Sequence, residues 1–160
     1  MAQEQMAKPI VVLREDGVRY KQGPSLFKAT GAQTGGRFDF FEMEIEYLTG
    51  PGLHRHANQE DTFYVLEGVL TVQTGETLHE LGPGDFISIP PGVPHTFDNT
   101  RKDQRAVKVI NLMTPGGYDG LFAENEHLPK DADPAEVDRI NAKYEVTYVG
   151  PSLGEILGLT

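Results

Sequence analysis

The sequence contains no cysteine, which excludes disulfides, thiolate metal ligands and cysteine nucleophiles. Histidine and carboxylate side chains are therefore the strong metal ligands that remain. No apolar run approaches the roughly 18 residues of a membrane span, and the first residues (Met-Ala-Gln-Glu-Gln) lack the basic region and apolar stretch of a signal peptide. We therefore expect a soluble, cytoplasmic protein without a membrane partner.

Positive charge is also scarce. The chain has 14 Lys and Arg against 24 Asp and Glu, a formal net charge of −10. Its largest basic cluster is Arg101-Lys102, and such a chain repels a phosphate backbone, so nucleic acid is not an expected partner.

The 160 residues show no shift in composition, which predicts one domain over residues 1–160.

Alternation of apolar and polar residues is the main structural signal. Over residues 41–47 the odd positions are apolar (Phe41, Met43, Ile45 and Tyr47) and the even positions are glutamates (42, 44 and 46). This alternation is typical of a half-buried strand with a solvated acidic face. Similar short runs between Gly/Pro turns predict strands at 9–14, 25–30, 60–66, 69–73, 77–81, 86–90 and 106–113.

The last third of the chain has a different pattern. Asp133, Pro134 and Glu136 form an N-cap, a first-turn proline and a capping-box acid, which predict a helix over 134–144. A shorter helical piece is expected near 118–124.

The strand pattern indicates an all-β fold, an antiparallel β-barrel or jelly roll with its core at about 37–113 and a short C-terminal helical extension at about 118–160. Such barrels can hold a small ligand or a metal in the mouth.

Three histidines lie where they could converge on one metal ion. His54 and His56 are two residues apart, so both side chains leave the same face of an extended chain. The rigid turn Pro90-Pro91-Gly92-Val93-Pro94 then delivers His95. His79 and His127 lie in an edge-like hairpin and an acidic segment, so we expect both to be surface residues.

Two motifs carry a resemblance to a known family. The second reads G-x5-P-x-G-x2-H-x3-N and is filled by Gly84, Pro90, Gly92, His95 and Asn99. The first is His54-x-His56, an acidic pair and a strand ending at Gly68, with 15 residues between Gly68 and Gly84. These motifs resemble those of the cupin family over about residues 37–113. A weaker likeness to small quercetin-dioxygenase-like cupins extends through 114–118.

The resemblance implies a metal held by His54, His56, His95 and a glutamate, and at the glutamate this chain departs from the pattern. The family position falls on Asp61, while Glu60 satisfies only the count from the histidines. Asp61 shares the parity of Phe63 and Val65, which favours Asp61 over Glu60. The aspartate side chain is shorter than that of glutamate by about 1.5 Å. We therefore expect that the backbone lies closer to the metal, that a water bridges the carboxylate and the metal, or that the carboxylate contacts a metal-binding histidine and not the metal itself.

The resemblance further implies a metal-dependent enzyme acting on a small organic substrate, such as a phenol, with quercetinase-like dioxygenation the nearest named chemistry. One divalent transition metal per chain (Fe, Mn, Ni, Co, Cu or Zn) would suit these ligands. Asp61 or Glu60 could double as the catalytic base, and the expected substrate pocket includes Tyr47, Phe63, Tyr64 and Phe97. Two alternatives stay open: a metal-assisted isomerase, cyclase or lyase, and a non-catalytic binding protein.

The predicted N-terminal strands bear on assembly. Residues Ile10–Leu13 and Leu26–Ala29 precede the barrel and would leave an open sheet edge unless another chain covers it. The sequence therefore predicts a homodimer.

Overall fold

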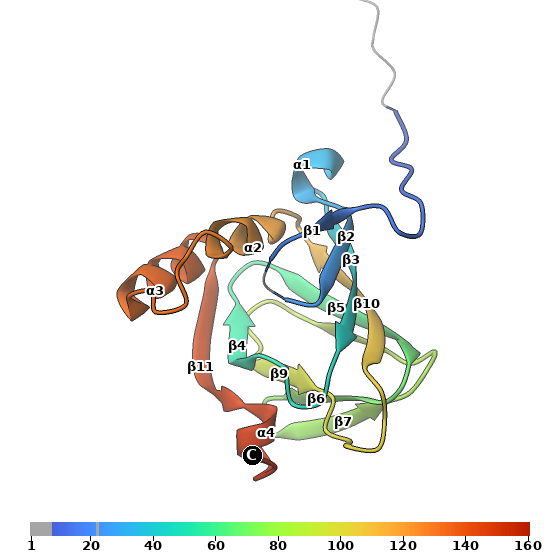
Figure 1. Ribbon diagram of the computed structural model, residues 1–160, viewed down its shortest axis with the longest axis vertical. Coiled ribbons are helices and arrows are strands. Elements are labelled where there is room, and N and C mark those ends of the chain that lie inside the picture. The colour runs from blue at the N-terminus through green and yellow to red at the C-terminus, as the bar shows by residue number, and fades with distance from the viewer. Residues whose placement is uncertain (1–7, 22) are drawn as a thin grey trace, which may run out of the picture.

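Two antiparallel β-sheets packed against each other form the body of the computed structural model, which describes residues 8–21 and 23–160 (Figure 1). The first sheet has the strand order β1-β2-β3-β10-β5-β8 and the second β11-β4-β9-β6-β7. The first comprises β1 (Val18–Arg19), β2 (Ser25–Ala29), β3 (Asp39–Ile45), β5 (Glu60–Glu67), β8 (Phe86–Ile89) and β10 (Val107–Thr114). The second comprises β4 (Gly52–His56), β6 (Leu70–Thr74), β7 (Thr77–Leu81), β9 (His95–Asp98) and β11 (Val146–Ser152).

The core lies between the sheets, where the alternating residues of each strand point inward. Strand β10 is central, because it pairs with β3 on one side and β5 on the other. Its odd-numbered residues are buried, and on β3 the predicted inward set of Phe41, Met43 and Ile45 is buried while Glu42 and Glu44 are exposed. The predicted antiparallel, all-β jelly-roll class is thus confirmed, although the two sheets do not close into a continuous barrel.

The predicted strand over 9–14 is wrong. Residues 8–13 form no strand, and the first strand is instead the two-residue β1. Lys28 explains part of this difference, because its Nζ donates hydrogen bonds to the carbonyl oxygens of Leu13, Arg14 and Asp16. A side chain on β2 thus occupies carbonyl groups that a sheet ladder would otherwise use.

The predicted C-terminal extension is helical only in part. Helices α2 (Asp119–Asn125) and α3 (Pro134–Lys143) match the expectation, and the Asp133 side chain caps α3 by accepting from the Ala135 N–H at 2.9 Å. Residues 146–152, however, form β11, which pairs with β4. The Gly150-Pro151 pair in this segment is typical of a turn, and the strand forms because β4 offers a free edge.

Helices occupy the ends of the sheets. In Figure 1, α2 and α3 lie together at one end, near the start of β11, and the short α4 (Leu153–Ile156) lies at the other end, where it contacts β9. The remaining helix, α1 (Gly31–Thr34), joins β2 to β3. None of the helices in the described part of the chain is long and apolar enough to span a membrane.

A buried carboxylate attaches the segment before α2 to the first sheet. Asp39, at the start of β3, is fully buried and accepts backbone N–H groups from Gly31, Gly117 and Tyr118. Burial raises the pKa of Asp39, while the three backbone donors act in the opposite direction. The carboxylate therefore fixes the entry to α2, which covers the interior at this end.

Replacing Asp39 by asparagine should destabilise the fold by roughly 3 kcal/mol, because an amide group cannot accept all three buried N–H groups. Urea unfolding measures this change. Asp85→Asn is the matched control, since the Asp85 side chain accepts one N–H, from Gly82, at an exposed turn. Equal losses in the two variants would contradict the role given to Asp39.

Candidate metal centre

Four buried side chains come together between the sheets. His54 and His56 are on β4, His95 is on β9 and Asp61 is on β5 of the other sheet. One ligand atom from each lies within 4.8 Å of the other three, and the residues are only 1% to 3% exposed. Three imidazoles and a carboxylate in this arrangement form a donor set that suits a divalent transition metal.

Strand pairing brings the histidines together. His54 and His95 are direct partners in the antiparallel ladder between β4 and β9. Gly92 holds the turn before β9 in place, because its N–H donates to the His56 carbonyl at 2.7 Å and its φ of +83° is one that side chains rarely adopt. The proline-rich turn therefore fixes His95 relative to both β4 histidines.

Backbone carbonyl groups orient two of the rings. Nδ1 of His54 lies 2.8 Å from the Gly52 oxygen, and Nδ1 of His95 lies 2.9 Å from the Val93 oxygen. Donation from Nδ1 leaves Nε2 as the lone-pair nitrogen, which is a common arrangement for metal-binding histidine. Nδ1 of His56 is buried and has no hydrogen-bond partner among the described residues. These features fit a metal held by the three imidazoles.

Burial and the neighbouring side chains shift the pKa values of the site residues. Burial, with a contribution from His95, lowers the pKa of His54 to about 4, so this ring is neutral at pH 7. Burial would raise the pKa of Asp61, but the His56 and His95 imidazoles outweigh it and hold the pKa well below its usual range. Asp61 Oδ2 lies 3.0 Å from His95 Nε2 and 3.7 Å from His56 Nε2. The shorter acid therefore reaches the histidines without a bridging group.

Asn111 is a site residue that the sequence analysis did not identify. Its amide nitrogen donates to Asp61 Oδ1 at 2.6 Å and to the Thr62 carbonyl at 2.8 Å. Asn111 is 3% exposed and lies on β10 directly opposite Phe63. A signal was present in the sequence, because asparagine interrupts the inward series of Val107, Val109 and Met113. A polar residue at such a position needs a buried partner.

We expect Asn111→Leu to lower metal affinity by roughly 10- to 100-fold, the effect typical of losing a group that orients a ligand. Leucine has a similar volume but cannot donate to the Asp61 carboxylate. Competition with a chromogenic chelator measures the affinity. Ile110→Leu is the control, because position 110 points to the opposite face of the same strand; a similar loss there would show a general effect on β10.

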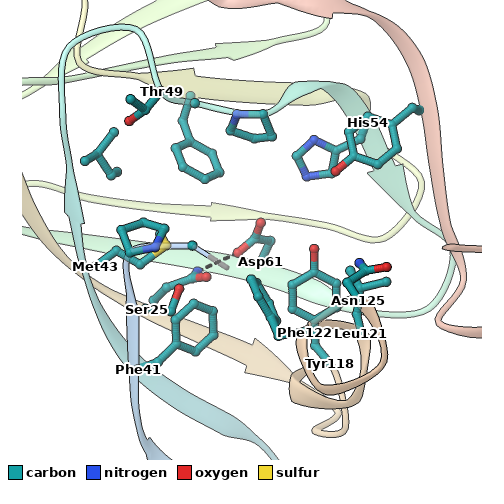
Figure 2. Close-up of a pocket in the computed structure, with 18 residues that line it drawn as sticks. Ser25, Phe41, Met43, Thr49, His54, Asp61, Tyr118, Leu121, Phe122 and Asn125 are labelled. Atoms are coloured by element: carbon teal, nitrogen blue, oxygen red, sulfur yellow. Dashed lines mark hydrogen bonds between the residues drawn. The ribbon is translucent and has the colours of Figure 1, made fainter. Parts of the chain in front are cut away.

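A cavity of about 280 Å³ adjoins the cluster (Figure 2). His54 and Asp61 form part of its wall, and Figure 2 shows Tyr118, Leu121 and Phe122 along another part, where α2 covers the interior. Burial raises the pKa of the Tyr118 hydroxyl well above its ordinary value and also raises that of Tyr148, so both phenols stay protonated. The remaining lining residues are Gly23, Pro24, Ser25, Phe41, Met43, Ile45, Thr49, Gly50, Pro51, Phe97, Asn111 and Asn125.

Of the four predicted pocket residues, Phe97 lines the cavity and Tyr47, Phe63 and Tyr64 do not. Phe97 lines the cavity, and Phe63 is fully buried behind it, with ring centroids 4.7 Å apart. Tyr47 is half-buried beyond the end of β3, with the Lys102 ammonium 5.7 Å from its ring centroid. Tyr64 is 42% exposed on the outer face of β5, which contradicts its expected place in the pocket. Its even position gives it the parity opposite to Asp61.

Glu60 also lies away from the metal centre. Its side chain accepts a hydrogen bond from the Ser88 hydroxyl, which also contacts Thr62 on the outer face of β5. Of the two acids that the sequence left open, Asp61 is therefore the one that the structure places with the histidines. His79 and His127, expected at the surface, lie outside the cluster, with His79 Nε2 2.9 Å from the Thr74 hydroxyl.

Comparison with known proteins agrees with this geometry. A family model described as "Cupin domain" matches residues 41–112. Quercetin 2,3-dioxygenase from Bacillus subtilis is 28% identical over 142 residues, which cover 84% of this chain and 41% of that protein. The Aspergillus japonicus enzyme of the same name is 28% identical over 103 residues, which cover 60% of this chain and 29% of the enzyme. The chain thus spans less than half the length of these two relatives.

Solved structures show the same fold. One described as a predicted oxalate decarboxylase from Thermotoga maritima has a TM-score of 0.53 and 16% sequence identity, over 57% of this chain and 78% of that one. At this identity the likeness concerns the fold alone. The family model, the two motifs and the buried His₃Asp cluster together support a member of the cupin superfamily that resembles the quercetin 2,3-dioxygenases.

Proposed function

We propose that this protein is a metal-dependent cupin enzyme that acts on a small phenolic substrate by quercetinase-like dioxygenation. The observation that carries the proposal is the buried His54/His56/Asp61/His95 cluster opening onto a largely apolar cavity. The two curated relatives named quercetin 2,3-dioxygenase support the reaction type.

The donor set fits one divalent transition metal, held by the three histidine rings and the Asp61 carboxylate. When bound, such a metal supplies Lewis acidity toward a phenolic oxygen and, if it is redox-active, a route to reaction with O₂. The identity of the metal among Fe, Mn, Ni, Co, Cu and Zn is for elemental analysis to determine.

The surrounding residues would bind and orient the substrate. Phe41, Phe97 and Phe122 offer apolar ring faces, and α2 keeps bulk water from the interior. The depressed pKa of Asp61 makes it a weak proton acceptor, so we assign it to metal binding and not to general-base catalysis. Glu60 is also a poor candidate for the base, because it is hydrogen-bonded to Ser88 on the outer face.

Oxygen uptake tests the proposal. Protein reconstituted separately with each redox-active metal should consume O₂ in the presence of a flavonol or a catechol, and zinc-loaded protein should not. Turnover of a substrate without O₂ would instead support metal-assisted isomerase, cyclase or lyase chemistry. Ligand binding with no turnover under any metal would support a non-catalytic binding protein.

We also propose that the chain forms a homodimer. Ile10, Val11 and Leu13 are 42%, 77% and 69% exposed beside the outer strands β1 and β2, and such apolar side chains commonly pack against a partner. Light scattering should give twice the chain mass of 17.6 kDa. A monodisperse species at 17.6 kDa would contradict the dimer.

A further inference from the structure

The cavity continues well beyond the metal centre, as far as β2. Ser25, the first residue of β2, lines the cavity at this end, and Figure 2 shows it near Phe41 and Met43 and away from His54. Strand β2 is three positions from β5, which carries Asp61, in the order β2-β3-β10-β5. At about 4.8 Å per step, the two strands are roughly 14 Å apart along the sheet. A ligand could therefore meet polar groups at two separate ends.

The Ser25 hydroxyl lacks a hydrogen bond within the protein. Ser25 is 5% exposed, and its Oγ has no partner among the described residues. A buried hydroxyl that makes no hydrogen bond is unfavourable, and such groups in native proteins usually have a bound partner. Since this hydroxyl belongs to a residue of the cavity wall, the missing partner is best supplied by a molecule inside the cavity.

The rest of the wall restricts the charge of that molecule. No Lys or Arg is found among the described residues that line the cavity. Away from the metal centre, the polar wall groups are hydroxyls and amides, such as Thr49 and Asn125, and the other side chains are apolar. A carboxylate or phosphate placed there would lose its hydration without gaining a cationic partner. The cavity therefore favours a neutral ligand with an aromatic or aliphatic body.

We propose that the Ser25 hydroxyl is a specificity-determining contact, which binds a hydroxyl or carbonyl oxygen at the far end of a neutral ligand whose other oxygens lie at the metal centre. The contact at the metal end rests on the function proposed above. The Ser25 contact follows from the unpartnered hydroxyl and the absence of wall cations. It adds a requirement that metal binding does not impose, namely a second, uncharged oxygen group.

The test uses matched catechols bound to zinc-loaded protein, which should not turn them over. Each catechol carries at position 4 a straight chain of two to five carbons that ends in either a hydroxymethyl or an ethyl group of the same length. Calorimetry gives the affinity of each pair for wild type, Ser25→Ala and Ser25→Thr. A third series, ending in a carboxylate, tests the charge requirement.

At the chain length that spans the cavity, wild type should bind the hydroxyl-terminated compound about tenfold more tightly than its methyl-terminated partner. Ser25→Ala should lose this preference and keep the affinity for the methyl-terminated compound, and Ser25→Thr should retain part of it. The carboxylate series should bind no more tightly than the methyl series. Ligand-free Ser25→Ala should melt at the same or a higher temperature than wild type, because the removed hydroxyl bonds to no protein group.

Two outcomes overturn the inference while leaving the proposed function intact: catechols bind but no chain length shows a hydroxyl preference, or the preference persists in Ser25→Ala. Tighter binding of the carboxylate series would overturn the neutral-ligand requirement. If none of the catechols binds the zinc-loaded protein, the proposed phenolic function fails, and the two-ended ligand inferred here, which needs the contact at the metal centre, fails with it.

Discussion

His95→Ala should lose nearly all of the bound metal, with metal affinity falling by more than about 100-fold, because removing a ligand costs more than removing a group that orients one. Wild type should purify with, or take up, close to one divalent metal per chain. His95 is the direct strand partner of His54, and its ring lies within the four-residue cluster. Elemental analysis after dialysis against metal-free buffer gives the stoichiometry.

The control for this variant is His79→Ala. The His79 ring contacts Thr74 on the β6–β7 hairpin and lies outside the cluster, so its removal should leave the metal content unchanged. Circular dichroism should show that both variants keep the β-sheet fold. Equal metal content in wild type and in folded His95→Ala would refute the assignment of the site.

Asp61→Asn should weaken metal binding by at least 10- to 100-fold, whereas Glu60→Gln should leave it unchanged. Both substitutions remove one negative charge at nearly constant shape, so they compare position alone. Asp61 points between the sheets toward His56 and His95, while Glu60 points outward to Ser88. Chelator competition on the two variants side by side measures the difference.

The reverse ranking would show that β5 is shifted by one residue, since such a shift moves every side chain to the other face of a strand. Asp61→Glu is a companion test of side-chain length. In this structure aspartate already reaches the histidines and is held by Asn111 at 2.6 Å, so a longer acid has to displace that contact. We therefore expect Asp61→Glu to bind metal less tightly than wild type, whereas tighter binding would show that the shorter acid is a compromise.

The sequence by itself determined the fold class and the identity of the histidines. Strict alternation along 41–46 and 107–113 defines which residues face the core, because successive side chains on a strand point to opposite sides. The same rule places His54 and His56 on one face and separates Asp61 from Glu60. Spacing within the chain is sufficient for these conclusions, since each depends on neighbouring residues of a single strand.

Tertiary structure decided what depends on contacts between distant segments. Strand β11 forms because β4 has a free edge, and residues 8–13 form no strand, in part because Lys28 bonds to the carbonyl oxygens at 13 and 14. Asn111 reaches Asp61 from a strand 50 positions along the chain. The cavity likewise combines residues of both sheets and α2. Periodicity marks Asn111 as a polar residue on an inward face, but it names no partner for any of these segments, because each contact arises only when folding brings separate parts of the chain together.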